Sequence, residues 1–191
     1  LTPGSHEDIA LLRNLIKQSS NWLVLVQVLK RQLKMAETDQ DRISVLRELT
    51  DAYFNQLKNP QKGIDAILNA RRMFSNQYEA LDLLFSSFEK VDSPQMEEKI
   101  LAEFLADFEV LKDARSAKLI IERSGKGDVS KEKMLETMKE HLTKFEQVGN
   151  TDIVFDLSEA LVIQGIFDLP IAERAFSGAV SRGNHEAIKR F

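Results

Sequence analysis

The sequence has 191 residues with 26 Lys and Arg against 30 Asp and Glu, a net charge of −4, 43% hydrophobic residues and no cysteine. This composition allows one large or two small domains with an apolar core. It excludes disulfides and thiolate chemistry, and it lacks the basic footprint of a nucleic-acid-binding protein.

Membrane insertion is not expected either. The longest apolar run, Trp22 to Val26, is far shorter than the roughly 20 residues that a membrane-spanning helix needs. A cysteine-free chain fits the cytoplasm, which we favour, and it fits a periplasmic location equally well, so the compartment stays open.

The chain begins with residues 1–6, which include Pro3, Gly4 and Ser5. We expect this stretch to be a cloning remnant or a disordered tail. From residue 7 to residue 123, apolar side chains recur at spacings of three and four, as on one face of a helix. The successive stripes are Ile9, Leu12, Leu15 and Ile16; Leu25, Val26, Leu29 and Leu33; Ile43, Leu46, Leu49, Tyr53 and Leu57; and Ile64, Ile67 and Leu68.

Helix start and stop signals agree with these stripes. Capping side chains precede helical stretches, twice together with a proline that suits the first helical turn. The signals are Thr38 with Asp41, Asn59-Pro60, Asn76 with Glu79, Ser93-Pro94, and the turn dipeptides Gly149-Asn150 and Gly183-Asn184. They predict about eleven helices of roughly 10 to 18 residues, joined by short turns, and no sheet.

One stripe is repeated along the chain. Leu46, Leu49 and Tyr53 return 35 residues later as Leu81, Leu84 and Phe88, with a helical segment between the two sets. Ala114, Ala117 and Ile121 continue the pattern 68 residues beyond the first set. A period in the mid-thirties on a helical background is typical of stacked helix hairpins.

The pattern changes after residue 123. Residues 124–130 hold Gly125 and Gly127 within a polar stretch, which predicts a loop or hinge. We expect residues 131–191 to form further helical hairpins whose repeat phase is open. Phe191 does not resemble the polar cap that closes a helical array, so we expect the chain to be a piece of a longer protein.

Residues 21–91 resemble tetratricopeptide-like (TPR) repeats, most closely those of long bacterial arrays. The matching residues are Trp22, Leu25, Leu29, Arg31-Gln32-Leu33, Asp41-Arg42, Leu46, Leu49, Ala52-Tyr53, Asn59-Pro60, Gly63, Ala66, Ile67, Ala70 and Glu79-Ala80-Leu81. The resemblance implies an all-α fold, a right-handed α-α superhelix of about five antiparallel hairpins, with TPR-like repeats across residues 7–123. It also implies a non-enzymatic scaffold that binds a peptide or helix of a partner protein in a concave groove.

In this family the first helix of each hairpin lines the concave groove, which implies nine partner-binding residues. They are Asn14, Lys17, Arg47, Asp51, Phe54, Asn55, Asp82, Ser86 and Lys90. Asp51 would repel a carboxylate, so the clamp that some relatives use for a C-terminal carboxylate is not expected here.

No catalytic, metal-binding or cofactor-binding pattern is present in the sequence. His6, His141 and His185 stand far apart, and His141 lies between Glu140 and Lys144, which predicts an exposed helix surface. Two alternatives to the scaffold stay open: an accessory or regulatory helical-repeat domain of a larger enzyme or secretion or envelope component, and a self-associating structural module.

Overall fold

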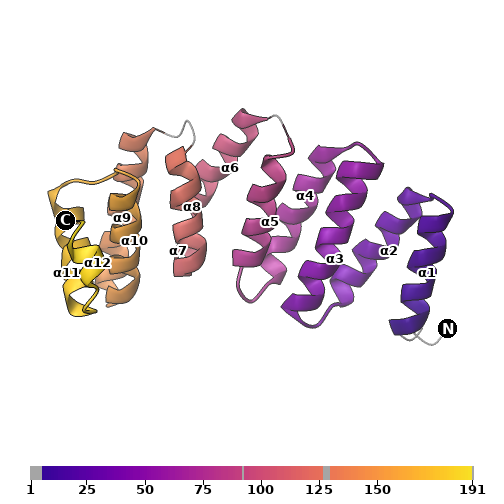
Figure 1. Ribbon diagram of the computed structural model, residues 1–191, viewed down its shortest axis with the longest axis horizontal. Coiled ribbons are helices and arrows are strands. Elements are labelled where there is room, and N and C mark those ends of the chain that lie inside the picture. Colours follow the sequence, from indigo (N-terminus) through magenta and orange to yellow (C-terminus); the bar gives the residue numbers. More distant parts are fainter. Residues whose placement is uncertain (1–5, 92, 127–129, 191) are drawn as a thin grey trace. The chain divides into compact units, whose positions relative to one another are not determined.

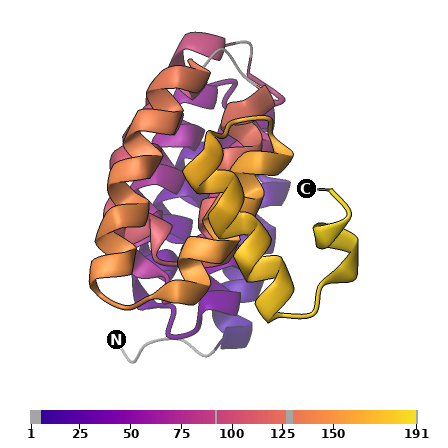
Figure 2. The same cartoon turned by 90° about the vertical axis from the view of Figure 1, so that its left-hand side faces the viewer.

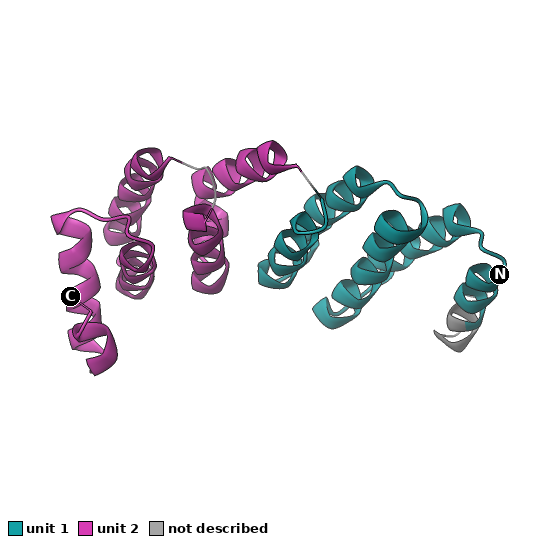
Figure 3. Cartoon of the chain, turned by 45° about the horizontal axis from the view of Figure 1, so that its top comes forward, with its two compact units in different colours: residues 1–91 teal, residues 92–191 magenta. Residues whose placement is uncertain are grey.

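The computed structural model describes residues 6–91, 93–126 and 130–190. These residues form twelve α-helices, one π-helical turn and one 3-10 turn, and they contain no strand, so the predicted all-α class is confirmed. The chain divides into two compact units, residues 1–91 and 92–191, which Figure 3 shows in teal and magenta.

The first unit consists of helices that alternate between two layers. Its elements are α1 (His6–Gln18), α2 (Trp22–Met35), α3 (Asp39–Asp51), η1 (Ala52–Gln56), α4 (Pro60–Ala70), η2 (Arg71–Met73) and α5 (Tyr78–Phe88). Each helix packs on the next along the chain, and α3 also contacts α5. In Figure 1, α1, α3 and α5 lie towards the viewer, with α2 and α4 behind them.

The repeated stripe forms the core of this unit. Leu46, Leu49 and Tyr53 lie on α3 and η1, and each exposes 4% or less of its surface. The second set, Leu81, Leu84 and Phe88 on α5, is buried to the same degree. Equivalent positions of α3 and α5 are therefore buried alike. A hydrogen bond also joins the start of α3 to the turn before α5: the Ser75 N–H donates to Asp39 Oδ2 at 2.9 Å.

Most predicted helix starts are confirmed. Thr38 and Asn59 accept hydrogen bonds from the N–H groups of Asp41 and Lys62, and Pro60 occupies the first turn of α4. The Asn76–Glu79 box differs from the prediction: α5 begins at Tyr78, whose N–H donates to Asn76 Oδ1 at 2.8 Å. The cap position of α5, Gln77, makes no side-chain cap hydrogen bond, and Ser93 makes none either, although Pro94 occupies the first turn of α6 as predicted.

The predicted stripe on α1 is only partly buried. Ile16 is 8% exposed, whereas Leu12 and Leu15 are 47% and 54% exposed. The physical reason is that α1 packs on α2, and no other described helix of the unit lies against it as closely. Neighbouring Leu11 is 60% exposed.

The second unit begins with a group of helices around α8. Its elements are α6 (Pro94–Ala106), α7 (Phe108–Leu111), α8 (Ala114–Lys126), α9 (Lys131–Gln147), α10 (Thr151–Ile163), α11 (Leu169–Ser181) and α12 (His185–Ile188). α8 contacts α6, α7 and α10, and α10 packs most extensively on α11. Figure 2 turns α9 to α12 towards the viewer, with α12 beside α11.

Two turns of this unit are formed as the sequence predicts. Gly149 and Gly183 adopt positive φ angles of 73° and 63°, which favour glycine. The asparagines that follow them, Asn150 and Asn184, cap α10 and α12 through their side-chain oxygens. Each dipeptide therefore ends one helix and starts the next.

The loop predicted for residues 124–130 is shorter than expected, because α8 continues through Lys126. Residues 127–129 lie outside the described part of the chain. Gly125 has a packing role instead: a Cβ there would lie 2.6 Å from Gln164 Oε1. A glycine that permits close approach of a neighbour gives the same sequence signal as a loop glycine.

Candidate functional site

A groove of about 830 Å³ lies between α2 and α4 in the first unit. Its residues are Leu23, Val26, Gln27, Lys30, Arg31, Leu33, Lys34, Leu49, Tyr53, Leu57, Asn59, Lys62, Asp65, Ala66, Asn69, Ala70 and Met73. We call this surface the α2–α4 groove. It is large enough to receive several side chains of a binding partner.

The floor of the groove is apolar. Val26 and Leu33 come from α2, and Leu49 and Tyr53 come from the helix between the two walls. These side chains are largely buried because they also belong to the core stripes. Leu23, in contrast, is 68% exposed at the groove edge, so apolar surface is available there to a partner.

The rim of the groove is basic. Lys30, Arg31 and Lys34 on α2 and Lys62 on α4 are exposed, and Asp65 is the one carboxylate among the lining residues. Lys30 Nζ lies 5.7 Å from the centre of the Tyr53 ring, a cation–π contact that holds this ammonium above the floor. An acidic chain therefore carries a locally basic groove.

The nine predicted partner-binding residues lie elsewhere. Asn14 and Lys17 are on α1, Arg47 and Asp51 on α3, Phe54 and Asn55 on η1, Asp82 and Ser86 on α5, and Lys90 follows α5. None of them lines the α2–α4 groove. Their helices form the layer that faces the viewer in Figure 1.

Several of these nine residues have contacts within the unit. Lys17 pairs with Glu48 at 2.8 Å, and the Asn55 amide donates to Asp51. The Phe54 ring lies against Gly63 of α4, where an added Cβ would overlap it. Phe54 is half-buried in this contact, so only part of its ring is open to a partner.

Sequence reasoning missed the groove because its walls come from separate helices. A signal is nevertheless present: Gln27, Lys30, Arg31 and Lys34 follow the spacing i, i+3, i+4, i+7, which places them on one face of α2. A polar helix face of this kind is usually only solvated. The apolar floor between the two walls, contributed by residues far away in sequence, distinguishes it here.

A smaller hollow of about 330 Å³ lies in the second unit, against α11. Its lining is mainly apolar and includes Phe167, Leu169 and Phe176, which are 55%, 71% and 44% exposed. Arg190 and Glu173 complete part of its edge. It is less than half as large as the α2–α4 groove and carries one cation and one carboxylate.

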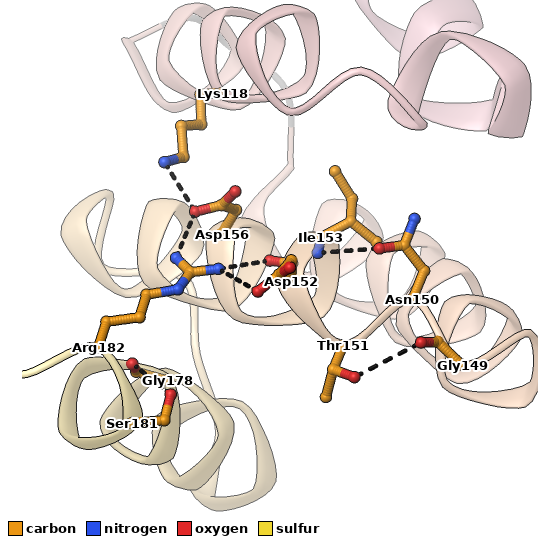
Figure 4. Close-up of polar contacts among 10 residues, drawn as sticks. All are labelled: Lys118, Gly149, Asn150, Thr151, Asp152, Ile153, Asp156, Gly178, Ser181 and Arg182. Atoms are coloured by element: carbon orange, nitrogen blue, oxygen red, sulfur yellow. Dashed lines mark hydrogen bonds and ion pairs between the residues drawn. The ribbon is translucent and has the colours of Figure 1, made fainter.

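A polar cluster joins α8, α10 and the end of α11 (Figure 4). Asp156 Oδ1 accepts from Arg182 Nη1 at 2.8 Å and from Lys118 Nζ at 3.1 Å. Arg182 Nη2 also donates to the backbone oxygen of Asp152 at 3.0 Å. Burial raises the pKa of Asp156, but the hydrogen bonds from Arg182 and Lys118 outweigh it and hold the pKa below its usual value. Asp156 and Arg182 are therefore engaged with each other and with neighbouring helices, which favours a structural role for the cluster.

His141 is buried, at 4% exposure, so the prediction of an exposed histidine is wrong. Its Nε2 lies 2.9 Å from the backbone oxygen of Leu105, and its ring stacks on Phe108 with 5.8 Å between centroids. Burial lowers the pKa of His141 more than the hydrogen bond to Leu105 raises it. The neighbours Glu140 and Lys144 could not predict the burial of His141, because the residue that covers it, Leu105, is 36 positions away in sequence.

In the part of the chain that the structure describes, no group of three or more His, Asp and Glu side chains is placed to hold a metal ion. Across the same residues, none of the helices combines the length and the apolar character required to cross a bilayer.

Comparison of the chain with protein-family models, with curated proteins and with solved structures finds no significant match. The fold class therefore rests on the helices themselves, and the resemblance to TPR-like repeats stays a prediction. The described residues form an all-helical fold with a sizeable, basic groove in the first unit.

Proposed function

We propose that this chain is a non-enzymatic protein-interaction module that binds a segment of a partner protein in the α2–α4 groove. The observation that carries the proposal is a groove of about 830 Å³ with an apolar floor and a positively charged rim. Interfaces typically join an apolar centre, which supplies affinity, to a polar rim, which fixes orientation.

This proposal keeps the predicted class of activity but changes the surface. The layer with Arg47, Asp51 and Phe54 is convenient for comparison, because it belongs to the same unit and does not line the groove. A partner bound there would contact α3, η1 and α5. A partner bound in the α2–α4 groove would contact α2 and α4.

A steric block separates the two surfaces. Asn69 is exposed on α4 and lines the groove, so Asn69→Trp would fill part of it. Ser86→Trp on α5 introduces the same bulk at an exposed position outside the groove. Circular dichroism of both variants establishes that they are folded.

Peptides are selected from a random display library on the wild-type chain, and their affinities for both variants are measured by fluorescence anisotropy. We expect Asn69→Trp to weaken binding at least about tenfold and Ser86→Trp to leave it within about twofold. Loss of binding on Arg47→Ala, Asp51→Lys or Phe54→Ala, with Asn69→Trp unaffected, would move the site to the predicted surface. A library that yields no peptide sensitive to either face would refute the interaction module.

The same proposal includes the finer architecture of the first unit, in which hairpins repeat as in TPR-like proteins and continue a right-handed superhelix. Supporting it are the equal burial of Tyr53 and Phe88 and the Asp39–Ser75 link, whose partners are 36 residues apart. An experimental structure in which one screw operation superposes α2–α3 on α4–α5 is the expected result. Two unrelated transformations would contradict it.

A further inference from the structure

Four cations that no carboxylate of the described residues neutralises lie together in the α2–α4 groove, whereas a second group of cations elsewhere in the chain forms ion pairs with carboxylates of its own unit. These paired cations are Arg13, Lys17, Arg42, Lys112, Lys118, Arg123, Lys126, Lys139, Arg174 and Arg182. Within the described ranges, Lys30, Arg31, Lys34 and Lys62 have no such partner.

The one carboxylate of the groove is already engaged. Asp65 Oδ1 accepts a hydrogen bond from Gln61 Nε2 at 3.0 Å, and both residues lie on α4. Four cations against one carboxylate leave three positive charges in excess along the groove. The chain as a whole has a net charge of −4, so this excess is a local property of the groove. A surface of this kind attracts a segment of opposite charge and disfavours a basic one.

The spacing of the cations fits the geometry of a peptide. Lys30 and Lys34 are one helical turn apart, about 6 Å along the axis of α2. Carboxylates four residues apart on a helix, or two residues apart on an extended strand, have about the same spacing. Lys62 faces the groove from the other wall. Acidic side chains of one segment can therefore meet cations on both walls.

Between the two walls, the floor can receive an apolar side chain. Leu57 and Met73 are half-buried there, and Leu23 is largely exposed at the edge. An apolar residue of the bound segment would remove this surface from water while its acidic neighbours face the rim. Charge alone would give only weak binding at physiological salt concentrations.

Nucleic acid fits the groove less well than an acidic protein segment. Single-stranded nucleic acids need exposed aromatic rings on which their bases stack. Tyr53 is the aromatic residue among those that line the groove, and it is 4% exposed. Its ring lies under Lys30 rather than open to a base.

We propose that the α2–α4 groove binds an acidic segment of a partner protein, in which Asp or Glu side chains flank an apolar anchor. The carboxylates face Lys30, Arg31, Lys34 and Lys62, and the anchor covers Leu23, Leu57 and Met73. This inference rests on the proposed function, since it names the chemistry of the segment that the groove takes.

The test uses the same display library on the full chain, with counter-selection on the double variant Lys30→Glu/Lys34→Glu. Both side chains are exposed on α2, and circular dichroism establishes that the double variant is folded without the Lys30–Tyr53 contact. The double variant Arg47→Glu/Lys90→Glu, at exposed positions of the same unit outside the groove, is the matched control; Arg47→Glu alone is measured beside it. Affinities of the selected peptides are measured by anisotropy at low and high salt, beside a labelled single-stranded oligonucleotide.

We expect the enriched peptides to combine acidic and apolar residues. Lys30→Glu/Lys34→Glu should bind them at least about tenfold more weakly, both control variants within about twofold, and high salt should weaken binding. Neutral or basic peptides that bind the groove and lose affinity on Asn69→Trp would overturn the acidic chemistry and leave the interaction module intact. Tighter binding of the oligonucleotide, lost on Lys30→Glu/Lys34→Glu, would overturn the inference in favour of nucleic acid. Absence of any groove-dependent peptide would refute both proposals.

Discussion

Gly178 of α11 lies directly against Phe155 of α10. A Cβ built on Gly178 would be 2.6 Å from both Cβ and Cγ of Phe155, which is closer than carbon atoms approach in proteins. α10 and α11 form the most extensive helix pair of the second unit. The missing side chain at Gly178 therefore allows the two helix axes to come close together.

Gly178→Ala is expected to destabilise the chain. The added methyl group meets the root of the Phe155 side chain, which cannot swing away, so we expect a cost of about 1 to 3 kcal/mol. The better helix propensity of alanine returns up to about 1 kcal/mol. Urea unfolding followed by circular dichroism measures the difference. Ser177→Ala, exposed on the same helix, is the control and should be neutral or slightly stabilising.

The Asp156 cluster predicts a loss of stability in acid. The pKa of Asp156 is lowered in the folded chain, so its contribution is present above the unfolded-state pKa of about 3.9 and is lost as the pH falls through the folded-state value. Asp156→Asn should remove about 1 kcal/mol at neutral pH, because the ion pairs are partly exposed, and should flatten the acid branch of the stability curve.

Asp152→Asn is the matched control for this prediction. Its carboxylate is 90% exposed although it also lies near Arg182, at 3.2 Å. We expect no measurable change in the urea midpoint at pH 7. Equal losses for the two variants would show that burial of the carboxylate does not decide the strength of the cluster.

Local signals predicted the helices and many of their ends. The stripe of Leu46, Leu49 and Tyr53 is buried as expected, since three- and four-residue spacing places these side chains on one face whatever lies beyond it. Thr38 and Asn59 cap their helices because a capping oxygen reaches only two or three residues ahead. Such features depend on neighbours in sequence.

Features that depend on distant residues were not predicted. His141 is buried because Leu105 and Phe108 lie over it, although Glu140 and Lys144 beside it are exposed. Lys30 and Lys62 line the same groove. No pattern in the sequence predicts that α2 and α4 form the two walls of one groove. The TPR-like resemblance implied partner contacts on the layer of α1, α3 and α5, and it carries packing information and no charge information.

His141 predicts a second, milder dependence on pH. Burial lowers its pKa in the folded chain, so between that value and about 6.5 the unfolded chain binds more protons. Its contribution is therefore complete above about pH 6.5 and decreases as the pH falls from there through the lowered folded-state pKa. We expect the urea midpoint of the wild-type chain to decrease over this range and His141→Gln to decrease less.

The exposed leucines of α1 test whether burial, and not membership of the apolar stripe, decides how much a substitution destabilises the chain. Leu15 and Ile16 are neighbours in the same apolar stripe, yet Leu15 is 54% exposed and Ile16 only 8%. Ile16→Ala should therefore cost about 2 kcal/mol or more, through lost burial and the cavity left behind. Leu15→Lys should change the free energy of unfolding by less than about 0.5 kcal/mol, because a lysine at an exposed helix position keeps its charge in water.

Urea unfolding of both variants, followed by the fluorescence of Trp22 at the start of α2, measures the two costs. Leu12→Lys repeats the test one turn earlier on α1, where the side chain is 47% exposed. A loss at Leu12 and Leu15 as large as the loss at Ile16 would mean that another part of the protein covers this face in solution. In that case the cover is either a second copy of the chain or another part of the same chain. Sedimentation of the wild-type chain detects a second copy, and a second copy also makes the unfolding midpoint depend on protein concentration. A cover within the same chain leaves the midpoint independent of concentration.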